Sequence, residues 1–152
     1  MANTYTQLYI HIIIVVKGRQ NQIAVENKSE FYKYITETVQ NKDNKLIAIN
    51  GGLDHIHILV SLNPKQSISD LVKDIKLSAS DLINSKKWLI GKFYWQEGFA
   101  AFSVSKSKIL DLIEYINNQE IHHKKKTFKE EYLGFLNKYG INYDERYIFS
   151  DN

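Results

Sequence analysis

The stretch from residue 5 to residue 16 constrains the fold most, because it is almost continuously apolar and rich in β-branched side chains. In a strand, successive side chains alternate between two faces, here Leu8, Ile10, Ile12 and Ile14 on one and Tyr9, His11, Ile13 and Val15 on the other. Both faces are largely apolar, which is typical of a central strand that is covered on both sides. The sequence therefore predicts a layered fold around this strand.

Periodicity and turn signals predict the remaining elements. The predicted strands cover residues 45–50, 55–62 and 93–104, the last with a turn or bulge near its start. The predicted helices are one capped by Ser29 with apolar positions to Val39, one started by Ser67 with apolar positions to Ile83, and two at 107–119 and 128–139. This order, β-α-β-β-α-β followed by helices, predicts an α+β fold of the ferredoxin-like split βαβ type, an antiparallel sheet with helices packed on it.

Composition limits the class of protein. A chain of 152 residues with 43% hydrophobic and 24% charged residues predicts one folded domain over residues 1–152. The absence of cysteine excludes disulfides and thiolate zinc sites, and no apolar run is long enough to cross a membrane. With no secretion signal either, we expect a cytoplasmic protein. The net charge of +3 permits binding to nucleic acid without requiring it.

Two histidines, His55 and His57, occupy alternate positions in a second apolar run at residues 54–60. A strand would point both imidazoles to the same face, about 7 Å apart at the backbone. That spacing allows them to bind one metal ion. The alternative is that both histidines only form hydrogen bonds within or beside the core.

A tyrosine and a glutamine, Tyr115 and Gln119, are four residues apart within a predicted helix, so they fall on one side of it. A metal site together with a presented tyrosine is suited to cutting a phosphodiester through a covalent intermediate. The alternative is that Tyr115 is a boundary residue with its ring packed and its hydroxyl in water, and that Gln119 lies on the surface.

The ordered motifs resemble a known family. They are His55-Ile56-His57, Trp95-Gln96-Glu97-Gly98-Phe99 and Tyr115-Ile116-Asn117-Asn118-Gln119, joined by the segments 118–128 and 140–147. Together they resemble the HUH endonuclease superfamily, which is named for its His-hydrophobic-His strand. Within it, the chain looks like the small single-tyrosine transposases of bacterial insertion sequences. The resemblance extends over nearly the whole chain.

The resemblance implies a mechanism. Tyr115 would attack the scissile phosphate of DNA and leave a 5′-phosphotyrosine and a free 3′-hydroxyl, and strands would later be rejoined. His55, His57 and Gln119 would bind a divalent metal, Mg²⁺ or Mn²⁺ in this family. Two imidazoles alone suit zinc or manganese better than magnesium. The implied substrate is single-stranded DNA with a hairpin near the cleavage point.

The resemblance also implies partners. Family members form homodimers in which the tyrosine helix of one subunit acts in trans at the metal site of the other, and residues 100–106 would be the hinge of this exchange. The predicted DNA-binding cations are Lys17, Arg19, Lys73 and Lys76, and the alternative for each is an ordinary solvated surface charge. Trp95 and Phe99 either stack on bases or pack in the core. The cluster at residues 122–126 is typical of solvated surface unless it lies beside a site.

The sequence therefore favours a metal-dependent single-stranded DNA transposase. One alternative is a domesticated relative that processes chromosomal palindromes with the same chemistry. Another is a non-catalytic module that binds single-stranded nucleic acid, although such modules stack bases on strand aromatics, and Ile12, Ile14 and Ile58 occupy those strands here. A structural metal-binding protein would leave Tyr115 and Gln119 unexplained.

Overall fold

The structure is a computed structural model that describes residues 3–120 and 125–149. His122 and His123 of the predicted surface cluster lie outside these described residues. The strands are β1 (Tyr9–Val15), β2 (Lys45–Gly51), β3 (His55–Ser61) and β4 (Ala100–Ser103). The α-helices are α1 (Lys28–Asn41), α2 (Ile68–Lys86), α3 (Ile109–Asn117) and α5 (Phe128–Lys138). Short 3₁₀ helices cover Lys17–Arg19, Val25–Asn27, Lys106–Lys108 and Glu145–Tyr147.

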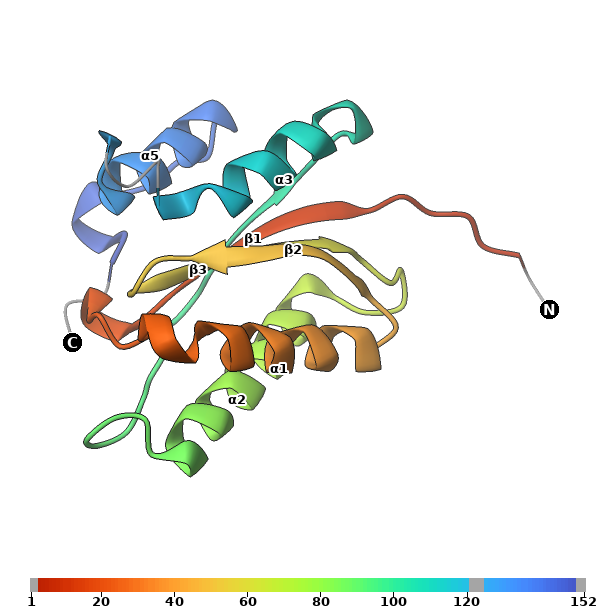
Figure 1. Cartoon of the computed structure of the whole chain (residues 1–152). Helices are drawn as coiled ribbons and strands as arrows, with labels where there is room; N and C mark the ends of the chain where they lie inside the picture. The colour runs from red at the N-terminus through yellow and green to blue at the C-terminus, as the bar shows by residue number, and fades with distance from the viewer. Residues whose placement is uncertain (1–2, 121–124, 150–152) are drawn as a thin grey trace.

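The four strands form one antiparallel sheet in the order β2-β3-β1-β4. Helices α1 and α2 cover one face of the sheet, and α3 and α5 cover the other (Figure 1). This arrangement confirms the predicted α+β, ferredoxin-like fold and the central place of β1. No helix in the described part of the chain is both long enough and apolar enough to span a membrane.

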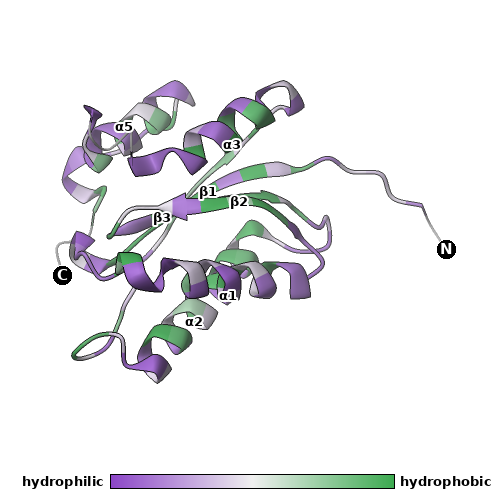
Figure 2. Ribbon diagram, viewed as in Figure 1, coloured by the Kyte–Doolittle hydropathy of each residue, from purple (hydrophilic) through white to green (hydrophobic). Residues whose placement is uncertain are grey.

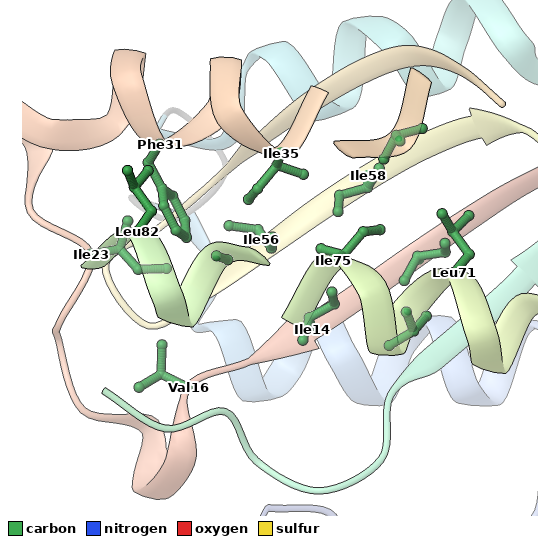
Figure 3. Close-up of a cluster of buried hydrophobic side chains, with 14 of the residues drawn as sticks. Ile14, Val16, Ile23, Phe31, Ile35, Ile56, Ile58, Leu71, Ile75 and Leu82 are labelled. Atoms are coloured by element: carbon green, nitrogen blue, oxygen red, sulfur yellow. The ribbon is translucent and has the colours of Figure 1, made fainter. Parts of the chain in front are cut away.

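The face under α1 and α2 carries the larger apolar core. Alternate side chains of β1 and β3, such as Ile14 and Ile56, point toward Phe31 and Ile35 of α1 and toward Ile75 of α2 (Figure 3). All five side chains are almost fully buried. Burying a side chain of this kind stabilises the fold by ~1.5–3 kcal/mol relative to leaving it exposed. Figure 2 shows that these helices have both apolar and hydrophilic residues, as helices with one buried side do.

The opposite face combines apolar and polar residues. Ile13 and Val15 of β1 pack with Phe102 of β4 and with Phe128 of α5. Three histidines, His11, His55 and His57, lie on the same face because their positions alternate with residues of the larger core. This second layer therefore contains buried polar groups, which need partners inside the protein.

Of the predicted strand at 93–104, only Ala100–Ser103 form a strand, and the turn expected near its start is present at Glu97 and Gly98. Residues 93–99 form a loop in which Trp95 makes an isolated bridge with Val16, just after β1, and the N–H of Gln96 donates to the carbonyl oxygen of Val15. Gly98 has a φ of +79°, and Lys76 Nζ donates hydrogen bonds to the carbonyl oxygens of Gln96 and Gly98. These contacts turn the backbone out of the sheet.

Two helix starts also differ from the sequence prediction. Helix α1 begins at Lys28 after Asn27, so Ser29 lies inside it and does not cap it. The predicted helix from residue 107 begins as a 3₁₀ turn, and α3 itself starts at Ile109. The predicted cap of α2 is confirmed, because the Ser67 hydroxyl accepts a hydrogen bond from the backbone N–H of Asp70.

We expect Gly51→Ala to destabilise the β2–β3 hairpin. A Cβ at Gly51 would overlap the carbonyl oxygen of His55 and lie 2.8 Å from the Cα of Ile56. The backbone would have to move apart, at a cost of ~1–3 kcal/mol of unfolding free energy by analogy with overpacking. Urea denaturation followed by circular dichroism measures this loss. An unchanged unfolding midpoint would mean that the hairpin accommodates the methyl group freely.

Candidate active site

The two histidines of β3 lie on the face that α3 and α5 cover. In the β1–β3 register, Ile13 is opposite His57 and Val15 is opposite His55, so the imidazoles are flanked by apolar side chains. His55 is 1% exposed and His57 is 0% exposed. The prediction that both point the same way is confirmed, since they share contacts with one carboxylate.

His55 is held by its neighbour in sequence. Its Nδ1 lies 2.7 Å from Oδ1 of Asp54, whose Oδ2 accepts a hydrogen bond from Arg19 at 3.4 Å. Burial lowers the pKa of His55 to about 4, although the hydrogen bond to Asp54 acts in the opposite direction. The imidazole is therefore neutral at pH 7, which is the form that binds metals.

His57 is held by a residue of the neighbouring strand. Its Nδ1 lies 2.9 Å from Nε2 of His11, and the two rings stack with centroids 5.1 Å apart. His11 itself is 0% exposed, and burial keeps its pKa well below the usual value. In both β3 histidines, Nδ1 is engaged, so Nε2 is left to face the centre of the site.

A glutamate of α5 occupies that centre. Oε1 of Glu131 lies 2.9 Å from Nε2 of His57 and 3.9 Å from Nε2 of His55. The side chain is buried, and the ring of Phe128, on the same helix, stacks on His55 with centroids 3.7 Å apart. Helix α5 thus covers both histidines and brings a carboxylate between them.

Tyr115 and Gln119 meet the other oxygen of the same carboxylate. The side chain of Asn50 on β2 donates hydrogen bonds to the carbonyl oxygens of Ile116 and Asn117, which fixes the end of α3 on the sheet. The Tyr115 hydroxyl then donates to Oε2 of Glu131, and Nε2 of Gln119 donates to it at 3.4 Å. Both side chains therefore reach one carboxylate, but the predicted helix to residue 119 is wrong at its end, because α3 stops at Asn117 and Gln119 follows its C-cap, Asn118.

The environment keeps Tyr115 protonated. Burial raises the pKa of the Tyr115 phenol, and its hydrogen bond to Glu131 raises it further. A phenol in this state is a weak nucleophile until its proton leaves. The group placed to receive that proton is Oε2 of Glu131.

The donor atoms lie close enough together that they could bind a single divalent metal ion. One ligand atom each from His55, His57 and Glu131 lies within 4.8 Å of the others, and Oε1 of Gln119 is 3.4 Å from Nε2 of His55. Adjacent ligand atoms in an octahedron of radius about 2.1 Å are ~3 Å apart. A mixed set of two imidazoles and oxygen atoms suits Mn²⁺ better than imidazoles alone would. The set is therefore a candidate metal site.

The predicted DNA-binding cations are spread over the molecule. Arg19 is next to the site through Asp54, and its guanidinium also lies 4.8 Å from the centroid of the Phe149 ring. Lys17 is exposed beside the ring of Tyr94. Lys73 and Lys76 are on α2, across the sheet from the histidines, and Lys76 holds the loop at 96–98. Their contact with DNA stays a prediction.

The aromatic residues of the Trp95–Phe99 motif have different surroundings. Trp95 packs against Phe31 and Phe93 at the larger core, and its indole N–H donates to the carbonyl oxygen of Lys76. Phe99 is 37% exposed. Of the two alternatives, base stacking and core packing, the structure therefore shows core packing for Trp95.

Sequence reasoning missed Glu131, and it placed His11 on one face of the first strand without assigning it a role. Glu131 lies within an apolar helical stripe with Phe128, Tyr132 and Phe135. A charged residue in such a stripe indicates a buried carboxylate that needs a partner. His11 interrupts the apolar strand β1 in the same way, but its neighbour could be found only from the β1–β3 register.

Comparison with known proteins gives matches over most of the chain. A family model described as "Transposase IS200 like" matches residues 4–119. The ISDra2 transposase TnpA of Deinococcus radiodurans is 28% identical over 121 residues, which are 74% of this chain and 84% of that protein.

Two solved structures share the fold. A candidate transposase from Deinococcus radiodurans R1 has a TM-score of 0.61 at 21% identity, covering 78% of this chain and 95% of that chain. A REP-associated tyrosine transposase bound to a REP hairpin has a TM-score of 0.61 at 13% identity, covering 81% of this chain and 73% of that chain. At these identities, the likeness concerns the fold alone.

We expect the metal-free protein to bind one Mn²⁺ ion and His57→Ala to lose this binding. Loss of the Nε2 ligand should lower the affinity for Mn²⁺ by more than about 100-fold. Mutating a residue that only hydrogen-bonds to a metal ligand typically costs less than this. Isothermal titration calorimetry at pH 7 measures it. Tyr115→Phe is the matched control, because it keeps every candidate ligand. Equal affinities of His57→Ala and wild type would exclude this metal site.

Proposed function

Because this chain belongs to the family of IS200-like transposases, we propose that it cuts and rejoins single-stranded DNA through Tyr115. One observation carries the proposal. The two oxygens of the Glu131 carboxylate contact Nε2 of His57 and the hydroxyl of Tyr115, respectively. The carboxylate of Glu131 therefore connects the candidate nucleophile, Tyr115, directly with the candidate metal ligand His57.

The proposed reaction is a transesterification. The Tyr115 oxygen attacks the phosphorus of the scissile phosphate while the bond from phosphorus to the 3′ oxygen breaks. The phenol proton passes to Oε2 of Glu131, and the leaving 3′ oxygen takes up a proton from water to become a hydroxyl. The product is a 5′-phosphotyrosine, which keeps the energy of the broken bond for strand transfer without ATP.

His55, His57, Glu131 and Gln119 are the proposed ligands of a divalent metal, Mn²⁺ or Mg²⁺. Such an ion neutralises and polarises the phosphate oxygens and helps to orient the 3′ end. Asp54 and His11 hold the two imidazoles in the orientation that this binding requires, through contacts of 2.7 and 2.9 Å to Nδ1.

The proposed substrate is single-stranded DNA that carries a hairpin. Support comes from the sequence resemblance and from the structural neighbour that was solved with a REP hairpin. A transposase would find its hairpins at the ends of its own element. A domesticated relative would use the same chemistry on chromosomal palindromes, and the DNA that flanks the gene distinguishes the two.

We also propose that the active form is a homodimer that exchanges α3. An exchanged helix makes the same contacts with the partner as with its own chain, so the exchange costs little. The predicted hinge at residues 100–106 is too long, because Ala100–Ser103 form β4 and the N–H of Val104 donates to the carbonyl oxygen of Tyr9. The hinge is then confined to Ser105 and the 3₁₀ turn at Lys106–Lys108.

We expect a covalent protein–DNA adduct with hairpin-bearing single strands taken from the flanks of the gene. It should form with Mn²⁺, disappear with EDTA, and be lost completely in Tyr115→Phe, which lacks the attacking oxygen. A denaturing gel with labelled DNA measures it. Tyr34→Phe on α1 is the matched control and should keep full adduct formation. An adduct that survives in Tyr115→Phe would refute the proposal.

We expect a mixture of His57→Ala and Tyr115→Phe to regain adduct formation that neither variant shows alone. In an exchanged dimer, one of the two sites then combines an intact histidine pair with an intact tyrosine. The same gel measures the recovery, and analytical ultracentrifugation measures the mass of the complex. No recovery from a mixture of properly folded variants would mean that each chain uses its own tyrosine.

A further inference from the structure

A cavity of about 330 Å³ lies between α3 and α5, beside Tyr115. Its lining includes Tyr115 and the buried Glu131 at one side and exposed residues of α5, such as Gly134 and Lys138, at the other. The cavity therefore connects the solvent with the candidate nucleophile. The mechanism proposed above assigns no role to it.

The charge of this cavity favours an anion. Lys125, Lys126 and Lys138 line it, and within residues 3–120 and 125–149 none of them forms an ion pair. Its two acidic residues have other partners. Glu130 is part of the capping box with Thr127, and Glu131 contacts His57 and Tyr115. The three lysines are therefore the uncompensated charges of the cavity.

A glycine in the middle of α5 has no packing reason to be there. Gly134 lies in the interior of the helix, where glycine is less favourable than alanine. A Cβ built on Gly134 meets no heavy atom within 4 Å. A larger side chain at this position would extend into the cavity. The glycine thus keeps the cavity open at a cost to helix stability.

We infer that this cavity binds the phosphate backbone of the DNA strand as it enters the site. Lys125, Lys126 and Lys138 bind the phosphates that flank the one attacked by Tyr115, and Gly134 leaves space for the strand. Lysines act here as point charges on phosphates, so the binding is independent of base sequence. The inference rests on the proposed function and specifies the path of its substrate.

The first test measures DNA binding without chemistry. A fluorescein-labelled single strand of twenty thymidines is titrated in EDTA with the double variant Lys125→Ala/Lys138→Ala at several salt concentrations. Each lost phosphate contact lowers the salt slope by about 0.7 for single strands, so the slope should fall by about 1.4. The control, Lys33→Ala/Lys42→Ala, removes two exposed lysines of α1 and its C-cap, across the sheet, and should match wild type. Equal slopes for all three proteins, or no binding by wild type, would overturn the inference.

The second test asks whether a side chain that fills the cavity at residue 134 blocks DNA binding. Gly134→Ala should raise the melting temperature by about 2–4 °C, through its helix propensity. Gly134→Leu should fold at least as stably as wild type but bind the thymidine strand at least about 10-fold more weakly. Binding as tight as wild type in Gly134→Leu would overturn the role of the cavity. If wild type forms no adduct but the lysine and glycine effects on binding persist, the proposed chemistry fails and the binding site stands.

Discussion

Buried imidazoles set the structure of the layer above the sheet. A polar group removed from water costs free energy unless it finds a partner, and His11, His55 and His57 are all almost fully buried. His11 contacts His57, His57 contacts Glu131, and Glu131 contacts Tyr115. This series of contacts connects β1 and β3 with α5 and α3. The position of both helices on the sheet therefore depends on the same groups that are available for chemistry.

The architecture was predictable where the signals are local. Two-sided burial of β1 follows from its continuous apolar pattern, and the order of the elements follows from periodicity and caps such as Ser67. A turn or bulge near the start of the segment 93–104 was expected, but the full loop at 93–99 was not, because its aromatic, extended composition is that of a strand. Its course depends on Lys76, which binds the carbonyl oxygens of Gln96 and Gly98 from another element. Contacts of this kind have no signature in the local sequence.

In the candidate site too, some residues follow from local sequence patterns and others depend on tertiary packing. The shared direction of His55 and His57 follows from the strand period. The helix period does not explain how Tyr115 and Gln119 come together, because α3 ends at Asn117. The resemblance to single-tyrosine transposases is confirmed by the family match over residues 4–119. Glu131 was missed, because its place at the centre of the site depends on how α5 packs across the sheet. Only its position within an apolar stripe distinguishes it in the sequence from an ordinary surface glutamate.

The helices on the two faces of the sheet are held by different amounts of apolar packing, so the two layers need not unfold together. The α1–α2 face contains one large cluster of apolar residues, whereas the α3–α5 face contains two smaller clusters around the polar centre. Regions with less apolar burial open at lower free energy than the global unfolding of the protein. By this principle, the α3–α5 layer is expected to open at a lower free energy than the sheet with α1 and α2. Opening of the α3–α5 layer alone would expose His55 and His57 and would leave the frame that carries them folded.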